Sequence, residues 1–304
     1  MRIAIVGAGG VGGYIGAKLC ALKEEKPKKY EIIFIARGKH AEAVKANGLR
    51  VIEDQDEFTA VPSSVCSAEE ANGTFDLILF CVKSYDIEEA VSSLKKNIRP
   101  DTVIIPFANG VTNAETIGAM ADAKVLNGCA YILSHIREPG IIRKKGKVFA
   151  AVFGNPKFIG ESLYVEHMFK DAGLRTKVPE DIKTAVWKKY LFICAFATLT
   201  SYFDTNIKAV YDAHYSIAKA VLEEIAAVAE AKGIDLRSEV QKALGSASNL
   251  PAEASTSMHL DFQNCRKTEL ETLTGHIVKE AARLGVSAPK ITDMYNTLKE
   301  MTNG

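Results

Sequence analysis

Short apolar runs alternate with helical patterns along the first part of the chain. Four such runs, each closed by Gly, Arg, Lys or Asn, cover Arg2–Val6, Glu31–Ala36, Phe75–Val82 and Val103–Phe107. Between them, the spacing of apolar residues is helical over Val11–Leu22, Lys39–Asn47, Ile87–Asn97 and Thr112–Met120. Continuous apolar strands separated by helices are typical of a parallel sheet that is buried on both faces. The pattern therefore predicts an α/β fold with an N-terminal Rossmann-type doubly wound parallel sheet.

Further strands are expected after this sheet. Apolar alternation covers Lys124–Ser134, Ile141–Arg143 and Lys147–Phe153. Pro139-Gly140 and Lys145-Gly146 are turn-forming pairs that separate these strands.

The pattern changes to helical spacing from Asp181 to the end of the chain. Breaks are expected at Lys232-Gly233, at residues 245–256 and at residues 285–289, and one helix is expected over Asp261–Leu284. We therefore predict two domains, residues 1–178 as a cofactor-binding domain and residues 179–304 as an all-helical domain of about five helices. The cleft between two domains is the default place for a ligand.

Composition and charge exclude several classes of protein. Lys and Arg number 38 and Asp and Glu 37, so the net charge of +1 gives no strong basic field for nucleic acid. No apolar stretch is long enough to span a membrane, and MRIAIVGAGG lacks the features of a secretory signal. The six cysteines have no metal-ligand or CxxC spacing. We expect a reduced, cytoplasmic protein with no metal site and no nucleic-acid or membrane partner.

A glycine motif follows the first strand directly. Gly7, Gly9 and Gly12 form G-x-G-x-x-G. In a dinucleotide-binding turn these glycines permit the tight turn, the approach of a pyrophosphate and close packing of the helix on the strand. Gly10 and Val11 lie at the head of the predicted helix, whose free N–H groups would face the phosphates, and are further candidates for cofactor binding. The alternative is an ordinary glycine-rich turn, but the order of strand, turn and helix favours dinucleotide binding.

Basic residues follow the second strand, where an NAD-binding protein carries a carboxylate. Arg37 ends this segment, and Lys39 and His40 come next. A guanidinium can bind a 2′-phosphate through two hydrogen bonds, so these residues favour NADPH over NADH. The alternative is that they are solvated residues at the start of a helix.

Lys83 and Asn109 each follow a predicted strand. Both are placed at the carboxyl edge of the sheet, where α/β proteins bind ligands. Taken singly, each has an ordinary alternative, a solvent-facing lysine and an Asn-Gly turn. Their shared edge with the glycine motif favours a functional role.

Three residues of the helical part are candidates for the chemistry. Lys188 and Lys189 precede the apolar stretch YLFICAFATL, and a partly desolvated lysine is suited to proton transfer. Glu269 lies beside an apolar helical line. The alternatives are two solvated lysines and a surface pair between Glu269 and Arg266.

The motifs together resemble the ketopantoate reductases (2-dehydropantoate 2-reductases). GAGGVGGYIGAKL, ARGKHAEAVKANGL, VKSYD, the Asn109-Gly110 pair, W-x-K ending at Lys189, STSM and TEL occur in the family's order along nearly the whole chain. The resemblance implies NADPH-dependent reduction of 2-dehydropantoate to pantoate, a step towards pantothenate and coenzyme A. It also implies an active site between a Rossmann domain and a helical domain.

The resemblance also assigns roles by position. Lys189 matches the catalytic lysine at the substrate carbonyl oxygen, and Glu269 matches the acidic residue that holds the substrate hydroxyl. Ser257 matches the serine near the substrate carboxylate. Asn109 and Lys83 match the residues at the nicotinamide ribose and the reacting centre. The W-x-K spacing therefore selects Lys189 over its neighbour.

Three positions depart from the family pattern. Ile193 and Ala197 stand where many members carry asparagines, and Ala108 stands where Gln commonly precedes the Asn-Gly pair. These departures leave two alternatives open: a reductase of another branched 2-keto acid, and an NADPH-binding sensor without catalysis. Lys189 and Glu269 argue against the sensor, which needs no proton donor. The sequence leaves open whether the protein is a monomer or a homodimer.

Overall fold

The computed structural model describes residues 1–25 and 29–303 of the chain. It contains two compact units. Unit 1 comprises residues 1–108 and 112–182, and unit 2 comprises Asn109–Val111 together with the chain from Lys183 onward. The three-residue segment after residue 108 is therefore a part of unit 2 that lies within the sequence of unit 1.

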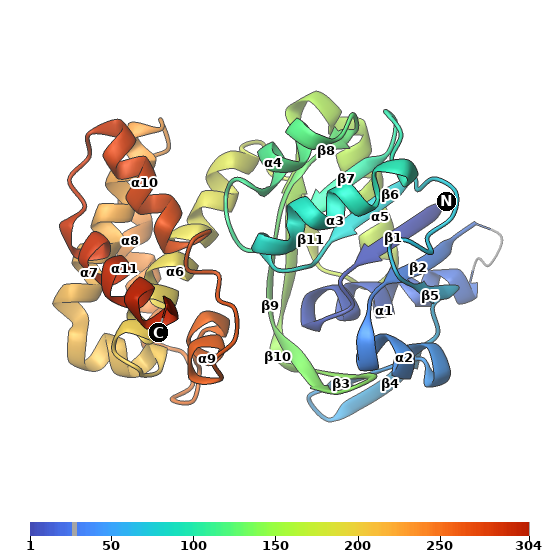
Figure 1. Ribbon diagram of the computed structural model, residues 1–304, viewed down its shortest axis with the longest axis horizontal. Helices are drawn as coiled ribbons and strands as arrows, with labels where there is room; N and C mark the ends of the chain where they lie inside the picture. The colour runs from blue at the N-terminus through green and yellow to red at the C-terminus, as the bar shows by residue number, and fades with distance from the viewer. Residues whose placement is uncertain (26–28, 304) are drawn as a thin grey trace. The chain divides into compact units, whose positions relative to one another are not determined.

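Unit 1 is built on a six-stranded sheet in the order β5-β2-β1-β6-β7-β8 (Figure 1). The strands are β1 Arg2–Val6, β2 Glu31–Ile35, β5 Ser64–Cys66, β6 Leu77–Phe80, β7 Val103–Pro106 and β8 Lys124–Val125. Every neighbouring pair is parallel. This is the strand order of a doubly wound dinucleotide-binding sheet, so the predicted fold class is confirmed.

The two faces of this sheet pack against separate cores. Ile3 and Ile5 of β1 belong to one hydrophobic cluster, and Ala4 and Val6 belong to another. Alternate residues of a strand point to opposite faces, so both faces are covered. The helices of this unit are α1 Gly10–Glu25, α2 Gly38–Asn47, α3 Ile87–Ser93, α4 Asn113–Met120 and α5 Ile159–Asp171.

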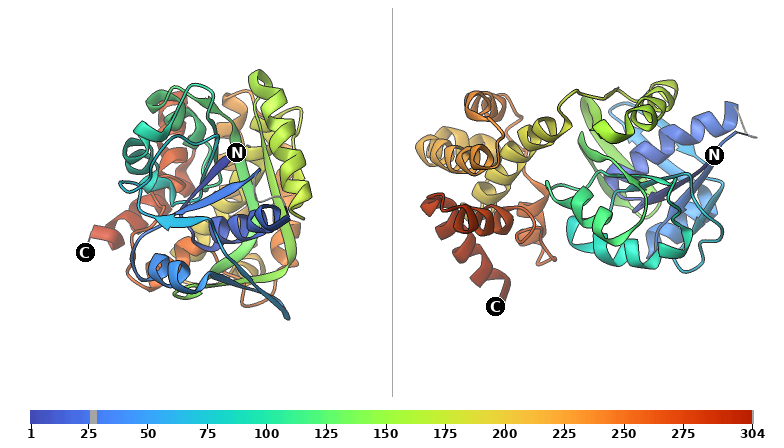
Figure 2. Two further views of the ribbon diagram at one scale, coloured as in Figure 1. Left: turned by 90° about the vertical axis from the view of Figure 1, so that its right-hand side faces the viewer. Right: turned by 90° about the horizontal axis from the view of Figure 1, so that it is seen from above.

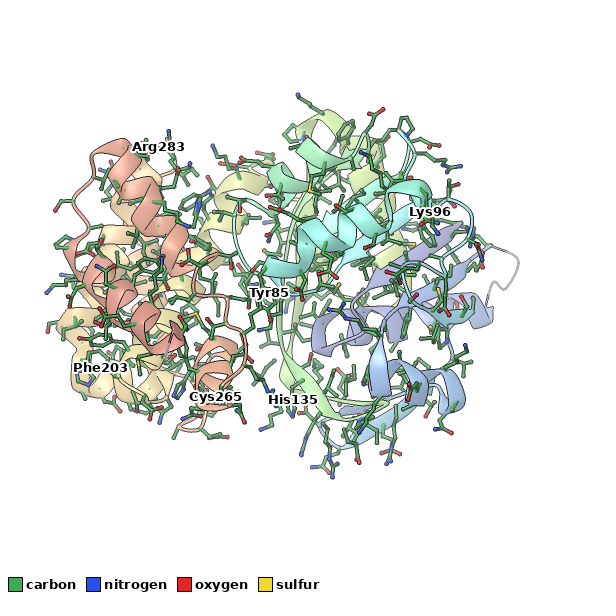
Figure 3. All side chains as sticks on the ribbon, viewed as in Figure 1. Tyr85, Lys96, His135, Phe203, Cys265 and Arg283 are labelled. Atoms are coloured by element: carbon green, nitrogen blue, oxygen red, sulfur yellow. The ribbon has the colours of Figure 1, made fainter. Side chains whose placement is uncertain are left out.

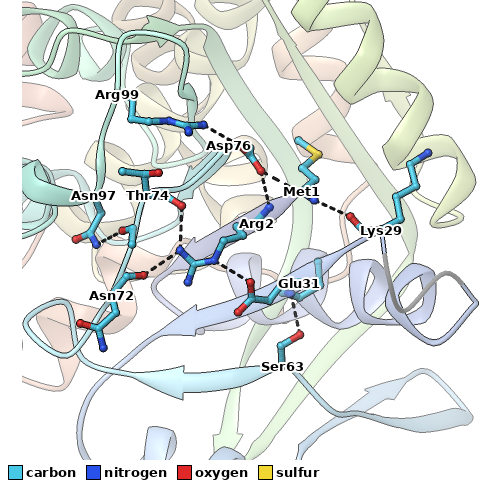
Figure 4. Close-up of polar contacts among 12 residues, drawn as sticks. Met1, Arg2, Lys29, Glu31, Ser63, Asn72, Thr74, Asp76, Asn97 and Arg99 are labelled. Atoms are coloured by element: carbon cyan, nitrogen blue, oxygen red, sulfur yellow. Dashed lines mark hydrogen bonds and ion pairs between the residues drawn. The ribbon is translucent and has the colours of Figure 1, made fainter.

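Arg2 ties together the amino ends of three elements, as Figure 4 shows. Its Nε donates to Oε2 of Glu31 at 2.8 Å, and its backbone N–H donates to Oδ2 of Asp76 at 2.7 Å. The other oxygen of Asp76 accepts from Arg99 at 2.9 Å. These contacts fix the edge of the sheet opposite the carboxyl ends of the strands.

A second sheet in unit 1 has the order β11-β10-β3-β4, with β9 paired to β10. Its strands are β3 Leu49–Glu53, β4 Asp56–Ala60, β9 Asn127–Glu138, β10 Ile141–Gly154 and β11 Thr176–Lys177. The predicted hairpin turn at Pro139-Gly140 is confirmed. The predicted turn at Lys145-Gly146 is wrong, because these residues lie inside β10 at a register shift between Lys144 and Phe149. Strand β10 pairs with β9 both before and after this bulge, so the strand continues through it.

The described residues of unit 2 beyond Lys183 form helices and connecting turns only, as predicted. The helices are α6 Ile182–Tyr202, α7 Ile207–Ala231, α8 Arg237–Ser248, α9 Ser257–Gln263, α10 Thr274–Leu284 and α11 Pro289–Asn303. Helix α7 contacts α8, α10 and α11 (Figure 2). In the described part of the chain, no helix has the length and apolar character that a membrane span requires.

The single helix predicted over Asp261–Leu284 is wrong. Helix α9 ends at Gln263, and Cys265 (labelled in Figure 3) has a φ of 50°. The N–H of Arg266 donates to the carbonyl of Asp261 at 2.8 Å, which closes the helix around a left-handed residue. A turn segment therefore precedes α10.

Candidate functional site

The glycine turn joins β1 to α1, and neither Gly7 nor Gly12 has room for a side chain. Gly7 has a φ of 93°, and a Cβ there would lie 2.9 Å from the backbone nitrogen of Val82. A Cβ on Gly12 would collide with the carbonyl oxygen of Gly7 and with Cys81. Both glycines are therefore required by the close approach of the turn, the helix and the end of β6.

Gly9 faces open space. No atom lies within 4 Å of the position that its Cβ would take. The first backbone hydrogen bond of α1 runs from Gly13 N to Gly9 O at 2.7 Å, so the N–H groups of Gly10 and Val11 precede the helical ladder. An open approach beside helix N–H groups fits the pyrophosphate of a dinucleotide.

Strand β9 supports the same turn from the side. A Cβ on Gly10 would collide with the backbone oxygen of Ser134. The Ser134 hydroxyl is buried and has no hydrogen-bond partner among the described residues. No local sequence pattern predicts this contact, because it depends on how β9 passes α1.

The three basic residues after β2 have different surroundings. The Arg37 side chain is 80% exposed, and its Nη1 lies 3.4 Å from Oε1 of Glu89 on α3. Lys39 is exposed, whereas His40 is half-buried. Burial lowers the pKa of His40, and its ring contacts the backbone on two sides. Arg37 and Lys39 thus remain the basic groups that fit a phosphate, and His40 has a separate role.

Lys83 and Asn109 lie after strands, as predicted. Lys83 precedes the short 3₁₀ helix Ser84–Asp86 that follows β6, one residue after the Val82 that contacts Gly7. Asn109 follows β7 and is succeeded by Gly110, whose φ of 122° favours glycine.

Asn109 is joined to Lys189 within unit 2. Nζ of Lys189 donates to Oδ1 of Asn109 at 2.8 Å, across 80 residues of sequence. Lys189 lies on α6, and Trp187 and Tyr190 on either side of it are buried with their rings in edge-to-face contact. These two buried rings therefore fix the position of α6 next to the half-buried Lys189.

Glu269 lies in the turn between α9 and α10 and is only 2% exposed. Its backbone carbonyl accepts from the N–H of Leu273 at 2.9 Å and from the Thr272 hydroxyl at 3.2 Å. The Tyr190 hydroxyl donates to the carbonyl of Leu273 at 2.7 Å. The residue that follows Lys189 thus holds the turn that carries Glu269.

Ser257 is exposed at the first position of α9, after the N-cap Thr256. The hydroxyls of Thr256 and Thr200 lie 2.8 Å apart, which ties this end of α9 to α6. His259 Nε2 lies 2.8 Å from Oδ1 of Asp204, and this contact lowers the pKa of the Asp204 carboxyl. Sequence reasoning missed His259, because nothing in the local pattern pairs it with a residue after α6.

The two apolar departures on α6 have different degrees of burial. Ile193 lies one turn after Lys189, is partly exposed and packs against the core. Ala197, a further turn on, is 1% exposed in the core of unit 2. An amide in place of Ile193 would thus be close to Lys189 along the helix, whereas one in place of Ala197 would enter the core.

Comparison with known proteins covers both units. Residues 3–157 match the family described as "Ketopantoate reductase PanE/ApbA", and residues 181–302 match "Ketopantoate reductase PanE/ApbA C terminal". The chain belongs to the ketopantoate reductase family. It is an oxidoreductase of this family, and the predicted resemblance is confirmed.

Individual members of the ketopantoate reductase family align over nearly the whole chain. The uncharacterized oxidoreductase YkpB of Bacillus subtilis is 28% identical and covers 98% of each chain. The crystal structure of 2-dehydropantoate 2-reductase from Porphyromonas gingivalis has a TM-score of 0.85 at 34% identity, covering 98% of this chain and 99% of that one. A D-mandelate dehydrogenase solved with NADH and anilino(oxo)acetate shares the fold, with a TM-score of 0.88 at 20% identity and coverage of 100% and 99%.

Proposed function

We propose that the protein is an NADPH-dependent reductase that converts 2-dehydropantoate to pantoate. The observation that carries the proposal is the hydrogen bond from Lys189 Nζ to Asn109 Oδ1. It joins the residue that matches the family's catalytic lysine to a residue that follows β7, and β7 lies beside β6, which precedes Lys83 and separates β7 from β1 and the glycine turn. The proposal assigns residues 1–178 to the cofactor and residues 179–304 to the substrate.

The chain's own groups suffice to hold and orient the cofactor. The N–H groups of Gly10 and Val11 bind the pyrophosphate, and the exposed guanidinium of Arg37 binds the 2′-phosphate. Lys83 and Asn109 follow the neighbouring strands β6 and β7 and would hold the nicotinamide ribose in this proposal. When bound, NADPH supplies the hydride that reduces a keto carbon.

Lys189 has the central role in the proposed chemistry. Its ammonium group has three N–H donors, of which one is directed at Asn109. Another donates to the carbonyl oxygen of the substrate, stabilises the charge that develops there and delivers the proton to the alkoxide. Glu269 accepts a hydrogen bond from the substrate hydroxyl, and Ser257 donates to the substrate carboxylate.

A second candidate function is the reduction of a less polar 2-keto acid. Ile193 offers an aliphatic surface one turn from Lys189, where an amide would recognise polar atoms. The D-mandelate dehydrogenase of the same fold is named for a different 2-hydroxy acid. The two candidates share the cofactor and Lys189 and differ in the substrate side chain.

NADPH consumption across a panel of 2-keto acids tests the proposal. The panel contains ketopantoate, 3,3-dimethyl-2-oxobutanoate, 2-oxoisovalerate and an aryl 2-keto acid. Ketopantoate is expected to have the highest kcat/KM. A preference for an apolar member supports the second candidate. Tight NADPH binding without reduction of any member supports the sensor and refutes both.

A further inference from the structure

His40 bridges two backbone segments with its imidazole ring. Its Nε2 lies 2.9 Å from the carbonyl oxygen of Ala8, and the N–H of Gly140 donates to its Nδ1 at 3.1 Å. A carbonyl oxygen only accepts and a backbone N–H only donates. The ring is therefore neutral, with its proton on Nε2.

The first of the two segments is the glycine turn. Ala8 lies between Gly7 and Gly9 and is only 3% exposed. A hydrogen bond to the Ala8 carbonyl sets the orientation of the peptide group that joins Ala8 to Gly9. The N–H of that peptide belongs to Gly9, the residue that faces open space. His40 thus acts on the orientation of the turn at the place where a phosphate would approach.

The second segment is the tip of the β9–β10 hairpin, which is itself fixed. Gly140 has a φ of 80°, and its carbonyl accepts from the N–H of Arg50 on β3 at 3.0 Å. A Cβ on Gly140 would lie 3.0 Å from Cβ of Ala43 on α2. The hairpin tip is therefore a rigid support for the ring, and the same hairpin contacts the turn again where Ser134 lies against Gly10.

We propose that His40 is a positioning residue for the dinucleotide. By donating to Ala8 and accepting from Gly140, it holds the glycine turn in the shape in which the N–H of Gly9 faces the pyrophosphate together with those of Gly10 and Val11. The proposal rests on the cofactor part of the proposed function and not on the identity of the substrate. Holding the turn before binding removes the entropic cost of ordering it when the dinucleotide arrives.

Protonation of the ring would break the bridge. A proton on Nδ1 would face the N–H of Gly140, donor against donor. Burial lowers the pKa of His40, opposed by the hydrogen bond to Ala8, so the neutral form persists to lower pH. Exposed ionisable side chains on the surrounding elements are screened by solvent, and they include Arg37 at the N-cap of α2, Lys39, Glu42 and Lys45 on α2, Arg137 and Glu138 at the hairpin tip, and Arg50 on β3. The less exposed Glu53 on β3 and Lys144 on β10 are paired with each other at 2.9 Å.

Three substitutions separate the two hydrogen bonds. His40→Gln retains an amide donor near the position of Nε2, so it keeps the Ala8 contact. His40→Asn retains an acceptor near the position of Nδ1, so it keeps the Gly140 contact. His40→Phe fills the same space and removes both. His135→Gln on β9 (labelled in Figure 3) is the matched control, because burial also lowers the pKa of that histidine.

The dissociation constant for NADPH is measured directly by fluorescence titration, and KM and kcat by steady-state kinetics. His40→Phe is expected to weaken NADPH binding and raise its KM about tenfold, with kcat within about twofold of wild type, since one hydrogen bond contributes roughly that factor. His40→Gln is expected to restore most of the affinity, and His40→Asn little of it. The control is expected to match wild type.

NADH lacks the 2′-phosphate, so titration with NADH at different pH values gives a second readout that the ionisation of this phosphate does not affect. Wild-type affinity is expected to fall as the pH is lowered through the pKa of His40, and the affinity of His40→Gln to stay flat. Equal weakening by Gln, Asn and Phe together with a lowered Tm overturns the proposal, as does wild-type affinity in His40→Phe. Binding without reduction of any keto acid refutes only the proposed substrate, whereas absence of binding by wild type refutes the cofactor assignment and this proposal together.

Discussion

Nζ of Lys188 lies 3.1 Å from Oε1 of Glu239, which Lys242 also contacts at 2.8 Å. Lys188 is exposed and engaged with α8, while the adjacent Lys189 is half-buried and donates to Asn109. Successive side chains of a helix point in directions about 100° apart, so the two neighbouring lysines contact different residues. The contacts therefore separate the two candidates that the apolar stretch alone left equivalent.

Lys189→Ala is expected to lower kcat about 10²- to 10⁴-fold, because it removes the proposed proton donor at the carbonyl oxygen. The dissociation constant for NADPH should change little. Lys188→Ala is the matched control and should cost at most a few-fold, since it removes a partly exposed ion pair. Steady-state kinetics of both variants with ketopantoate make the comparison. A larger loss from Lys188→Ala would contradict the assignment.

Arg37→Asp is expected to weaken NADPH binding about 10- to 100-fold and NADH binding only slightly, because the guanidinium is assigned to the 2′-phosphate. Glu89→Gln is the companion variant. It frees Arg37 from a contact of 3.4 Å, so NADPH affinity should rise by up to a few-fold. Fluorescence titration with both cofactors measures these effects. Equal losses for NADPH and NADH would rule out the role of Arg37.

Glu269→Ala is expected to reduce kcat/KM for ketopantoate about 10- to 100-fold, because the substrate hydroxyl loses its buried acceptor. The analogue 3,3-dimethyl-2-oxobutanoate lacks this hydroxyl and should be affected much less. Glu269→Gln keeps an acceptor and should be intermediate. If the alanine variant loses activity uniformly on both substrates, Glu269 serves the fold of its turn instead.

Ile193→Asn is expected to shift preference towards ketopantoate relative to 3,3-dimethyl-2-oxobutanoate, because an amide one turn after Lys189 adds polar recognition. Ala197→Asn is the contrasting variant. Since Ala197 is 1% exposed, the amide would enter an apolar core and cost about 1–3 kcal/mol of stability. The ratio of kcat/KM values and the Tm of each variant are measured. Parallel changes for both substrates in Ile193→Asn would exclude Ile193 from substrate selection.

Glu280 connects α10 to the end of α7, and its contribution to the free energy of unfolding is expected to depend on pH. Contacts with Arg283 and Lys232 lower its pKa to about 2, against 4.5 for the free group. Because the unfolded chain takes up this proton first, the stabilisation is present above about pH 5 and is lost as the pH falls towards 2. Glu280→Gln should lower the free energy of unfolding by about 1–2 kcal/mol at pH 7 and by less at pH 3.

Urea denaturation at the two pH values checks this expectation. Glu300→Gln on the exposed side of α11 is the control and should be nearly neutral. An equal loss at pH 7 and at pH 3 in Glu280→Gln would show that the carboxylate charge is not responsible.

The apolar runs predicted four strands of the six-stranded sheet, β1, β2, β6 and β7, because strands buried on both faces are largely apolar. Strand β5 was not predicted, and β8 was expected only as the start of one strand over Lys124–Ser134. Strands β3 and β4 were missed. Leu49–Glu53 is short and mixed in character, and its pairing with β10 is invisible to a local pattern. The end of α9 was missed for a similar reason, since Cys265 takes a conformation that usually signals itself through glycine.

The candidate site likewise contains residues that a local sequence pattern identifies and residues that only the folded chain reveals. Glycine spacing and the W-x-K motif identify residues whose role depends on local chain geometry or on family resemblance. His40 illustrates the opposite case: its position beside Arg37 and Lys39 suggests one more positive charge, whereas its two backbone partners make it neutral. Those partners lie 32 and 100 residues away, so only the folded chain brings them together.

The parallel pairing of β3 with β10 has a consequence for the order in which the nascent chain becomes structured on the ribosome. Arg50 is synthesised early, but its partner Ile141 emerges only after all strands of the six-stranded sheet have left the exit tunnel. Until then β3 is paired only with β4 and lacks a strand on its other side, and long-range closure of this kind is slow. Asn109 gains its hydrogen-bond partner later still, because Lys189 is synthesised after Ile141. A pause in translation at a point where β8 has left the exit tunnel and β10 has not would therefore expose an intermediate with a complete first sheet and an incomplete second sheet, the kind of species that chaperones bind.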